Sequence, residues 1–358
     1  MQCSLILVLL SFPGQMCGQY FNNPESVVYD TLNNRYLISN VGSGNIVQIE
    51  NSGDTSFFST VLTRTLGLVI VGDILFVTDF SGVVGFDLTT DQIVMTIPIP
   101  GMDILNDITA DTSGYLFVTD SGNGNIYRVK ISNQSSETIV SSIYWPNGIL
   151  YDEYNNRIIF CAFGSNVPIR AIDIENFSVS TVTTTNFSDL DGLSMDGGGY
   201  IYVSSWGSGS VYRYDNAFSS QPELISSGHN GPADIFYNKI NNVLVVPNFN
   251  DNTVDFIPVI PNSLVENNSP PQKFELSQNF PNPFNPTTKI NYYIPEGSFV
   301  SLKVYDVLGN EIIVLVNEEL QAGHHEIEFN GNGLSNGVYI YQINANDIVE
   351  TKKMILIK

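Results

Sequence analysis

Residues 115–129 read YLFVTDSGNGNIYRV. A run of apolar, β-branched and aromatic residues is followed by a Gly/Asn/Ser turn and then by a second run of the same kind, which is the signal for two antiparallel strands. Residues 200–214, YIYVSSWGSGSVYRY, repeat the pattern closely. No helical periodicity competes with it. The sequence therefore predicts an all-β protein.

The same pattern recurs along the first two thirds of the chain. Six segments open similar runs, and their equivalent positions follow one another at intervals of 40 to 44 residues: Ser26, Gly67, Asp107, Gly148, Gly192 and Asp234. This period is typical of the blades of a β-propeller. We predict a six-bladed β-propeller over residues 19–260. Its last unit has three strands, so its outer edge is either closed by residues 19–21 or left short.

The two ends of the chain differ from the repeats. Residues 1–18 contain the apolar run 5–10 and fit a secretory signal peptide. That run is too short to span a bilayer, and no other stretch is long and apolar enough for a transmembrane helix. Residues 261–272 are rich in Pro and Asn and predict a linker. Residues 273–358 contain six short strand patterns and predict a C-terminal immunoglobulin-like β-sandwich.

The composition limits the possible partners and chemistry. The formal net charge is −22, which argues against binding to nucleic acid. Acidic carboxylates suit hard cations such as Ca²⁺, although they also form ordinary solvated surfaces. Cys161 is the single cysteine after the signal peptide, so no intramolecular disulfide is predicted, and its apolar strand favours a buried thiol. His229 is the single histidine of the predicted propeller, which excludes a site with several histidine ligands there.

The residues that open the innermost strand of each blade are candidates for a site. Innermost strands meet at one end of a propeller's central channel, so side chains far apart in sequence converge there. Aligned on the repeat, these positions are Glu25, Leu66, Asn106, Asn147, Asp191 and Ala233. Two carboxylates and two amides form an oxygen-rich set that suits a hard divalent cation. The alternative is that the Asn-Gly and Asp-Gly pairs simply form turns.

The C-terminal domain carries four motifs in order. They are LSQNFPNPFNPTTKI at 276–290, LKVYDVLGNE at 302–311, GVYIY at 337–341 and KKMILIK at 352–358. Together they resemble the C-terminal sorting domain of the type IX secretion system. The resemblance implies export across an outer membrane through the type IX machinery, followed by release or anchoring at the cell surface. His324 and His325 are then expected to be edge-strand or turn residues rather than catalytic ones.

The propeller has a resemblance of its own. The segments PES at 24–26, PNG at 146–148, LDGLSMD at 190–196 and SWGSGSVYR at 205–213 look like the SMP-30/gluconolactonase family and overlap with NHL-type repeats. The resemblance implies a divalent metal, with calcium expected, held by Glu25, Asn147 and Asp191. It also implies that Asn106 binds substrate. The family's substrate-contacting Arg is replaced here by Ile104, so specificity for sugar lactones is not implied.

Two functions remain open from the sequence. The first is a metal-dependent hydrolase of a lactone-like ester, in which Asp191 orients or deprotonates the attacking water. His229, in the loop that enters the last blade, is a candidate substrate-binding or acid/base residue, or else a structural turn residue. The second is a non-catalytic propeller whose mouth binds a small molecule, glycan, peptide or surface partner.

Overall fold

The computed structural model describes residues 20–259, 274–279, 282, 284–295, 297–321, 323–346 and 348–356. The chain divides into two compact units, residues 1–264 and 265–358. The described residues form strands and turns without a helix, as predicted for an all-β protein, and so none of them forms a helix that could cross a membrane. The predicted signal peptide and linker lie outside the described residues. Both of them, and the predicted domain boundaries, stay predictions.

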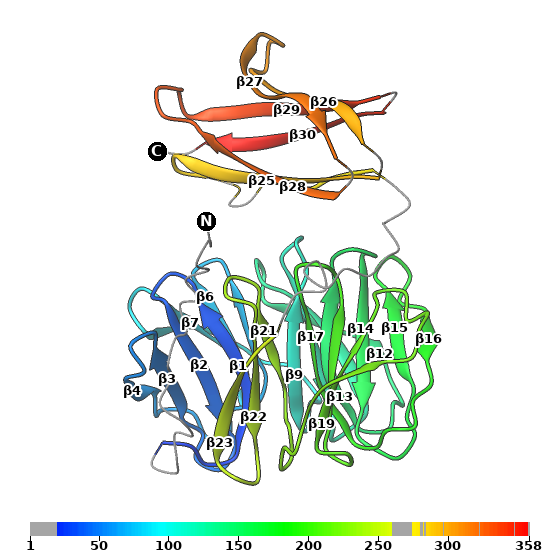
Figure 1. Ribbon diagram of the computed structural model, residues 1–358. Helices are drawn as coiled ribbons and strands as arrows, with labels where there is room; N and C mark the ends of the chain where they lie inside the picture. Colours follow the sequence, from blue (N-terminus) through cyan, green and yellow to red (C-terminus); the bar gives the residue numbers. More distant parts are fainter. Residues whose placement is uncertain are drawn as a thin grey trace. The chain divides into compact units, whose positions relative to one another are not determined.

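The first unit consists of six successive antiparallel sheets within the described residues (Figure 1). The strands of sheets 1 to 3 are β1 (Pro24–Asp30), β2 (Arg35–Asn40), β3 (Ile46–Glu50), β4 (Thr55–Ser59); β5 (Leu68–Val71), β6 (Ile74–Asp79), β7 (Gly82–Asp87), β8 (Gln92–Ile97); β9 (Leu105–Ala110), β10 (Tyr115–Asp120), β11 (Asn125–Lys130) and β12 (Ser135–Val140). Those of sheets 4 to 6 are β13 (Pro146–Asp152), β14 (Arg157–Ala162), β15 (Ile169–Asp173), β16 (Val179–Thr183); β17 (Leu190–Met195), β18 (Ile201–Ser205), β19 (Ser210–Tyr214), β20 (Glu223–Ser227); β21 (Phe236–Asn238), β22 (Val243–Asn248) and β23 (Thr253–Pro258).

The central strands contain continuous apolar runs because they are buried on both faces. In β10, Leu116 and Val118 pack with residues of sheet 2. Phe117, between them, packs with residues of sheet 4. Successive side chains of a strand point to opposite faces, so a strand between two sheets needs an unbroken apolar run. The turn that follows β10 requires Gly124, because an added Cβ would lie 2.3 Å from the Ile143 carbonyl oxygen and φ there is +73°.

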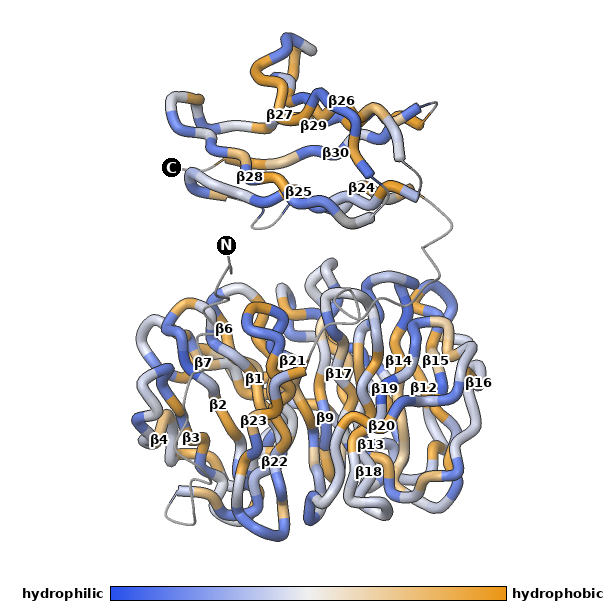
Figure 2. Tube along the Cα trace, viewed as in Figure 1, coloured by the Kyte–Doolittle hydropathy of each residue, from blue (hydrophilic) through white to orange (hydrophobic). Residues whose placement is uncertain are grey.

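Six hydrophobic clusters hold the sheets together, one between each pair of successive sheets. The cluster with Val27 and Ile38 of sheet 1 also contains Val245 and Val254 of sheet 6. The innermost strands contact one another in the order β1, β5, β9, β13, β17, β21, and β21 contacts β1. The sheets thus follow one another in a cyclic order. Figure 2 shows the hydrophobic residues along the strands and hydrophilic residues in the connecting loops.

Sheet 6 keeps three strands in the described part of the chain. This matches one of the two predicted alternatives, a short outer edge. The segment before β1 packs against side chains instead of extending the sheet: Phe21 is buried in the cluster between sheets 1 and 6, and the rings of Tyr20 and Phe57 meet edge to face at 5.4 Å.

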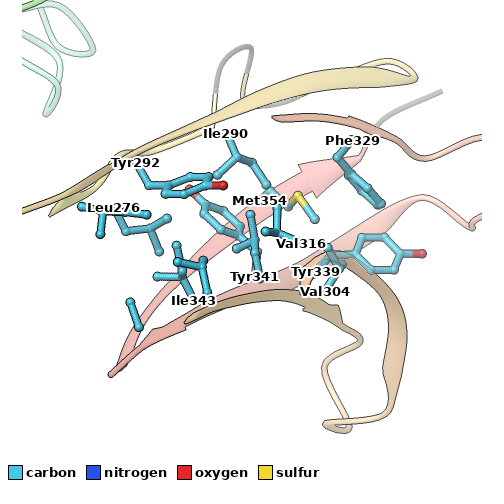
Figure 3. Close-up of a cluster of buried hydrophobic side chains, with 14 of the residues drawn as sticks. Leu276, Ile290, Tyr292, Val304, Val316, Phe329, Tyr339, Tyr341, Ile343 and Met354 are labelled. Atoms are coloured by element: carbon cyan, nitrogen blue, oxygen red, sulfur yellow. The ribbon is translucent and has the colours of Figure 1, made fainter. Parts of the chain in front are cut away.

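The second unit contains two antiparallel sheets, with orders β24-β25-β28 and β27-β26-β29-β30. The strands are β24 (Glu275–Leu276), β25 (Thr287–Ile294), β26 (Ser298–Tyr305), β27 (Glu311–Leu320), β28 (Gly323–Asn330), β29 (Gly337–Ala345) and β30 (Ile348–Leu356). Both sheets contribute to one buried core, with Ile290 and Tyr292 from the first and Val304, Tyr341 and Ile343 from the second (Figure 3). This arrangement is consistent with the predicted β-sandwich.

The four sequence motifs of this unit converge on each other. The Tyr341 hydroxyl donates to the Ser277 carbonyl at 2.8 Å and accepts from the Asn279 N–H at 2.8 Å, which joins the first motif to the third. The Phe284 N–H donates to the Ile355 carbonyl, which joins the first to the last. His324 and His325 lie on β28, an edge strand of its sheet, as expected from the sequence.

Candidate functional site

Three of the predicted site residues lie at irregularities in the first strand of their sheets. The register against the second strand shifts between Pro24 and Val27, between Pro146 and Ile149, and between Leu190 and Leu193. Bulges of this kind turn side chains away from the regular ladder. Glu25, Asn147 and Asp191 sit at these shifts, so the Asn-Gly and Asp-Gly pairs lie inside β13 and β17 and not in connecting turns.

The structure brings Glu25, Asn147 and Asp191 into one electrostatic group. Glu25 is buried, and burial together with the nearby Asp191 and Asp107 carboxylates raises its pKa well above the usual range. The Arg64 guanidinium opposes this rise in the pKa of Glu25. Residues 25 and 191 thus repel each other across sheets 1 and 5, which a bound cation would relieve.

Asp191 is the most constrained member of this group. Burial and the neighbouring Asp107 raise its pKa to about 8, against the lowering effect of Trp206 and Asn147. The Oδ1 atoms of Asp191 and Asn147 are buried, and neither has a hydrogen-bond partner. Buried oxygens without partners are rare in folded proteins because each loses its hydration without compensation. These two atoms are therefore free to bind a ligand.

A second pair of carboxyl groups lies one residue further along the innermost strands. Burial raises the pKa of Asp107 to about 7, partly offset by the backbone N–H groups of Ile149 and Ile108 and by a hydrogen bond to Asp234. Burial and Asp107 raise the pKa of Asp234 well above its usual range. The Ser26 hydroxyl donates to Asp234 Oδ2 at 2.5 Å. Asp107 and Asp234 thus form a buried acid pair, contributed by sheets 3 and 6, which the sequence analysis did not propose as site residues.

Side chains on the second strands of sheets 1 to 5 fasten each of these sheets to the start of the next. Each donates a hydrogen bond to the backbone carbonyl of the aligned residue in the following sheet, at 2.5 to 3.0 Å. These bridging side chains are Ser39, Thr78, Thr119, Cys161 and Ser204. Cys161 donates to the Asp191 carbonyl, and its pKa is raised by burial. The thiol is buried as predicted, and it also fixes the backbone of Asp191.

Replacing Cys161 tests this bridging role. Cys161→Ser is expected to fold with nearly unchanged stability, because a hydroxyl stands at the equivalent position in four other sheets. Cys161→Val is expected to lower the free energy of unfolding by about 1–3 kcal/mol, since it leaves the Asp191 carbonyl unpaired. Urea unfolding measures both, with Thr78→Val as the matched loss of a bridging hydroxyl. Equal stability of the Ser and Val variants would contradict the bridging role.

Asn106 and His229 are placed differently from the group above. Asn106 is half-buried, and its amide donates to the Ser121 hydroxyl at 3.0 Å. The ring of His229 lies between Ser226, at 2.8 Å, and Asn248 and Asp255, at 3.2 and 3.1 Å. Both ring nitrogens are therefore engaged within sheets 5 and 6. These contacts favour a structural role for His229, and its part in substrate binding stays a prediction.

The donors present suit a hard divalent cation. Glu25, Asn147 and Asp191 offer oxygen atoms only, which is the ligand chemistry of Ca²⁺. Within the described residues, no group of three His, Cys, Asp or Glu side chains is arranged to hold a metal ion. A site here thus needs the Asn147 amide beside the two carboxylates, and the unpartnered Oδ1 atoms of Asn147 and Asp191 fit that requirement.

The family follows from comparison of the sequence with known protein families. A profile described as SMP-30/Gluconolactonase/LRE-like region matches residues 23–231. The chain belongs to this family. The match covers sheets 1 to 5 and the loop that enters sheet 6, which includes Glu25, Asn106, Asn147, Asp191 and His229 but not Ala233 or Asp234. No curated protein sequence matches the chain.

The C-terminal unit is a secretion system C-terminal sorting domain, matched over residues 278–358. The protein is therefore exported across the outer membrane by the type IX route, to the cell surface or the medium. The matched range contains the four motifs of this unit apart from the first two residues of the first motif. The resemblance stated from these motifs is confirmed.

Solved structures with similar folds include relatives of this family. A gluconolactonase from Xanthomonas campestris shares 13% identity at a TM-score of 0.59, over 67% of this chain and 86% of that one. A calcium-binding protein, regucalcin, from Agrobacterium tumefaciens shares 16% at 0.56, over 66% and 90%. A chain of a nidogen/laminin complex shares 15% at 0.52, over 61% and 91%. At these identities the likeness shows the fold alone, a gluconolactonase-like propeller.

Proposed function

We propose that this protein is a secreted, metal-dependent hydrolase of a lactone-like ester, acting at the mouth of a closed six-bladed propeller with an immunoglobulin-like sorting domain. The cyclic order of the six hydrophobic clusters supports six blades. The observation that carries the site is the pair of buried, unpartnered oxygens on Asn147 and Asp191 next to the buried Glu25. We assign the cation to these three residues, with calcium as the metal.

Each residue of the proposed site has its own role in ester hydrolysis. A bound divalent cation supplies Lewis-acid polarisation of the ester carbonyl. Asp191 accepts the proton of the attacking water, and its neighbours Trp206 and Asn147 favour its charged form by lowering its pKa. Asn106, half-buried at the aligned position of sheet 3, orients the substrate. The surrounding burial excludes water and strengthens each of these electrostatic interactions.

A non-catalytic function is the second candidate. The single histidine of the first unit has both ring nitrogens engaged, so Asp191 is left as the base. If Asp191 serves only as a metal ligand, the same mouth binds a small molecule, glycan, peptide or surface partner without turnover. Metal dependence of stability is common to both functions, whereas hydrolysis belongs to the first alone.

Metal binding is expected to raise the stability of the protein. At a free Ca²⁺ concentration of about one hundred times Kd, the gain is roughly 2.7 kcal/mol, and EDTA should remove it. Glu25→Gln and Asp191→Asn keep the side-chain shape but remove one ligand charge, so each should reduce this gain. The exposed Asp73→Asn and Glu175→Gln are matched controls that should retain it. Thermal unfolding with and without EDTA, with metal analysis of the purified protein, provides the measurement.

The activity assay separates the two candidates. Hydrolysis of lactones and aryl esters by the wild type should fall by about 100-fold or more in Asp191→Asn, since positioned general bases contribute about 10²–10⁴-fold. A metal response without hydrolysis of any ester would favour the binding function. A wild type that holds no metal and is insensitive to EDTA would rule out the shared cation.

A further inference from the structure

A row of aromatic rings extends from the candidate site. The rings of Trp145 and Phe163 lie 6.4 Å apart, those of Phe163 and Trp206 5.7 Å, and those of Trp206 and Phe249 5.2 Å. The planes are tilted or edge to face, the arrangement that aromatic pairs favour. The four residues come from the loops of sheets 4, 5 and 6. We refer to them as the aromatic row.

The two tryptophans of the aromatic row lie near the candidate site. Trp206 lies against Asp191, and its side chain lowers the Asp191 pKa. The Trp206 Nε1 atom is buried without a hydrogen-bond partner of ordinary geometry. Trp145 comes two residues before Asn147 in the sequence. Trp206, inside the row, thus lies beside one of the proposed metal ligands, and Trp145, at one end of the row, is exposed to solvent.

The outer end of the row is held in an unfavourable backbone conformation. Trp145 has φ of +44°, in the left-handed region that bulky residues avoid, and its carbonyl accepts the Phe163 N–H at 2.9 Å. The residue is 52% exposed. Strain of this kind persists where the surrounding structure imposes it, and it concentrates at functional sites. At Trp145 the strained conformation leaves a large aromatic residue half exposed to water.

The loop that enters sheet 6 packs closely against the row. Gly231 has φ of +69°, and an added Cβ would lie 3.3 Å from two atoms of the Trp206 ring, so a larger residue would press on that ring. Leu66 and Ala233, the other aligned residues, are apolar, and Ile104 stands two residues before Asn106. The buried carboxylates of this region repel anionic ligands. The surroundings therefore suit an uncharged ligand with an apolar ring.

We propose that the aromatic row is a substrate subsite for the aryl or other apolar ring substituent of a neutral lactone or ester. The proposal rests on the proposed function and names its substrate class. The ester group lies over Asp191 and Asn147, and the ring substituent packs against Trp206 and Phe163 with Trp145 covering its outer face. Burial of the substituent supplies the binding free energy that positions the ester.

The chain offers a direct readout of this subsite. Its two tryptophans, Trp145 and Trp206, both lie in the aromatic row, so intrinsic tryptophan fluorescence reports on the row alone. Titration of the full chain, in Ca²⁺, uses γ-phenyl-γ-butyrolactone, γ-butyrolactone and glucono-δ-lactone. The phenyl lactone is expected to change the fluorescence and to bind at least tenfold more tightly than the other two.

Variants of Trp145 separate binding from folding. Trp145→Gly removes the ring and relieves the positive φ, so its melting temperature should equal or exceed that of the wild type while affinity for the phenyl lactone falls at least tenfold. Asn also tolerates a positive φ, so Trp145→Asn should show the same melting temperature and the same loss of affinity as Trp145→Gly. Phe57→Ala, which removes an exposed aromatic ring from β4, should leave the affinity unchanged.

The outcomes distinguish this inference from the proposed function. Binding of the phenyl lactone that depends on Trp145, without hydrolysis of any ester, would support the subsite and count against the hydrolase. Hydrolysis without a preference for the phenyl lactone, or with equal affinity in Trp145→Gly, would overturn the subsite alone. Tighter binding of glucono-δ-lactone than of the phenyl lactone would also overturn it.

Discussion

Removal of residues 273–358 is expected to stop the protein from reaching the cell surface or the medium, while the first unit still folds. The sorting domain carries the export signal, and the first unit buries its own six hydrophobic clusters. Domains with separate cores fold independently. The measurement is the distribution of the full-length and truncated chains between envelope and medium in a host with type IX secretion. The truncated chain should accumulate within the envelope.

Point variants refine this test. Tyr341→Phe removes the hydroxyl that joins Ser277 and Asn279, and should reduce export by loosening the first and third motifs from each other. Val314→Ala changes an exposed side chain of the same unit that lies outside the four motifs, and should be exported normally. Melting of the purified truncated protein shows whether the first unit is folded. Normal secretion of the truncated chain would contradict the assigned role of the domain.

Much of the fold could be predicted from the spacing of the repeats. The strands expected at residues 115–120 and 200–214 are β10, β18 and β19, and the short sixth sheet appears where the pattern ran out. The alternation of apolar and polar residues and the turn residues are local signals, so they can be read without knowledge of the tertiary structure. The sorting motifs were equally visible because their order and spacing follow from one sandwich core.

The buried acid pair of the site and the bridging side chains could not be predicted in this way. Asp107 and Asp234 were used only to mark the repeat, although other repeats have Ser or Gly at this position. That they meet depends on how sheets 3 and 6 are placed around the first unit and on the register shift in sheet 3, which the sequence does not show. The bridging side chains were missed for the same reason. Serine or threonine in a β-strand is too common to indicate a hydrogen bond to the next sheet.

The site therefore contains more negative charge than the three predicted ligands suggest. Four buried carboxyl groups interact with one another, those of Glu25, Asp107, Asp191 and Asp234. In the described residues, Arg64 is the basic group that lowers the pKa of Glu25. Such a group costs stability whenever its members ionise together. A cation bound by Glu25 and Asp191 lowers this cost, which connects metal binding to the pH dependence of folding.

Without metal, the protein is expected to lose stability as the pH rises from about 4 to about 8. The pKa of Asp107 is raised to about 7 and that of Asp191 to about 8, whereas an unfolded Asp titrates near ~3.9. Between these values the folded state binds more protons than the unfolded state, so the free energy of unfolding falls with pH. The stability contributed by these buried neutral acids is fully present below about pH 4. Each such group lowers the free energy of unfolding by on the order of 4 kcal/mol once the pH exceeds its folded pKa.

Two variants and added Ca²⁺ test the origin of this decline. Asp234→Asn removes one of the buried titrating groups, while its amide can still accept from Ser26 and can donate to Asp107, so the decline should become shallower. Asp152→Asn is a control whose pH dependence runs in the opposite direction. The pKa of Asp152 is lowered, because Asn155 and Arg157 stabilise its charged form. Removing this carboxylate should therefore cost stability at neutral pH and less in acid. Saturating Ca²⁺ should flatten the wild-type curve, because the bound ion favours the ionised carboxylates. Urea unfolding from about pH 2 to 9 measures all four curves. A metal-free wild type whose stability rises between about pH 4 and 8 would contradict the buried-acid account.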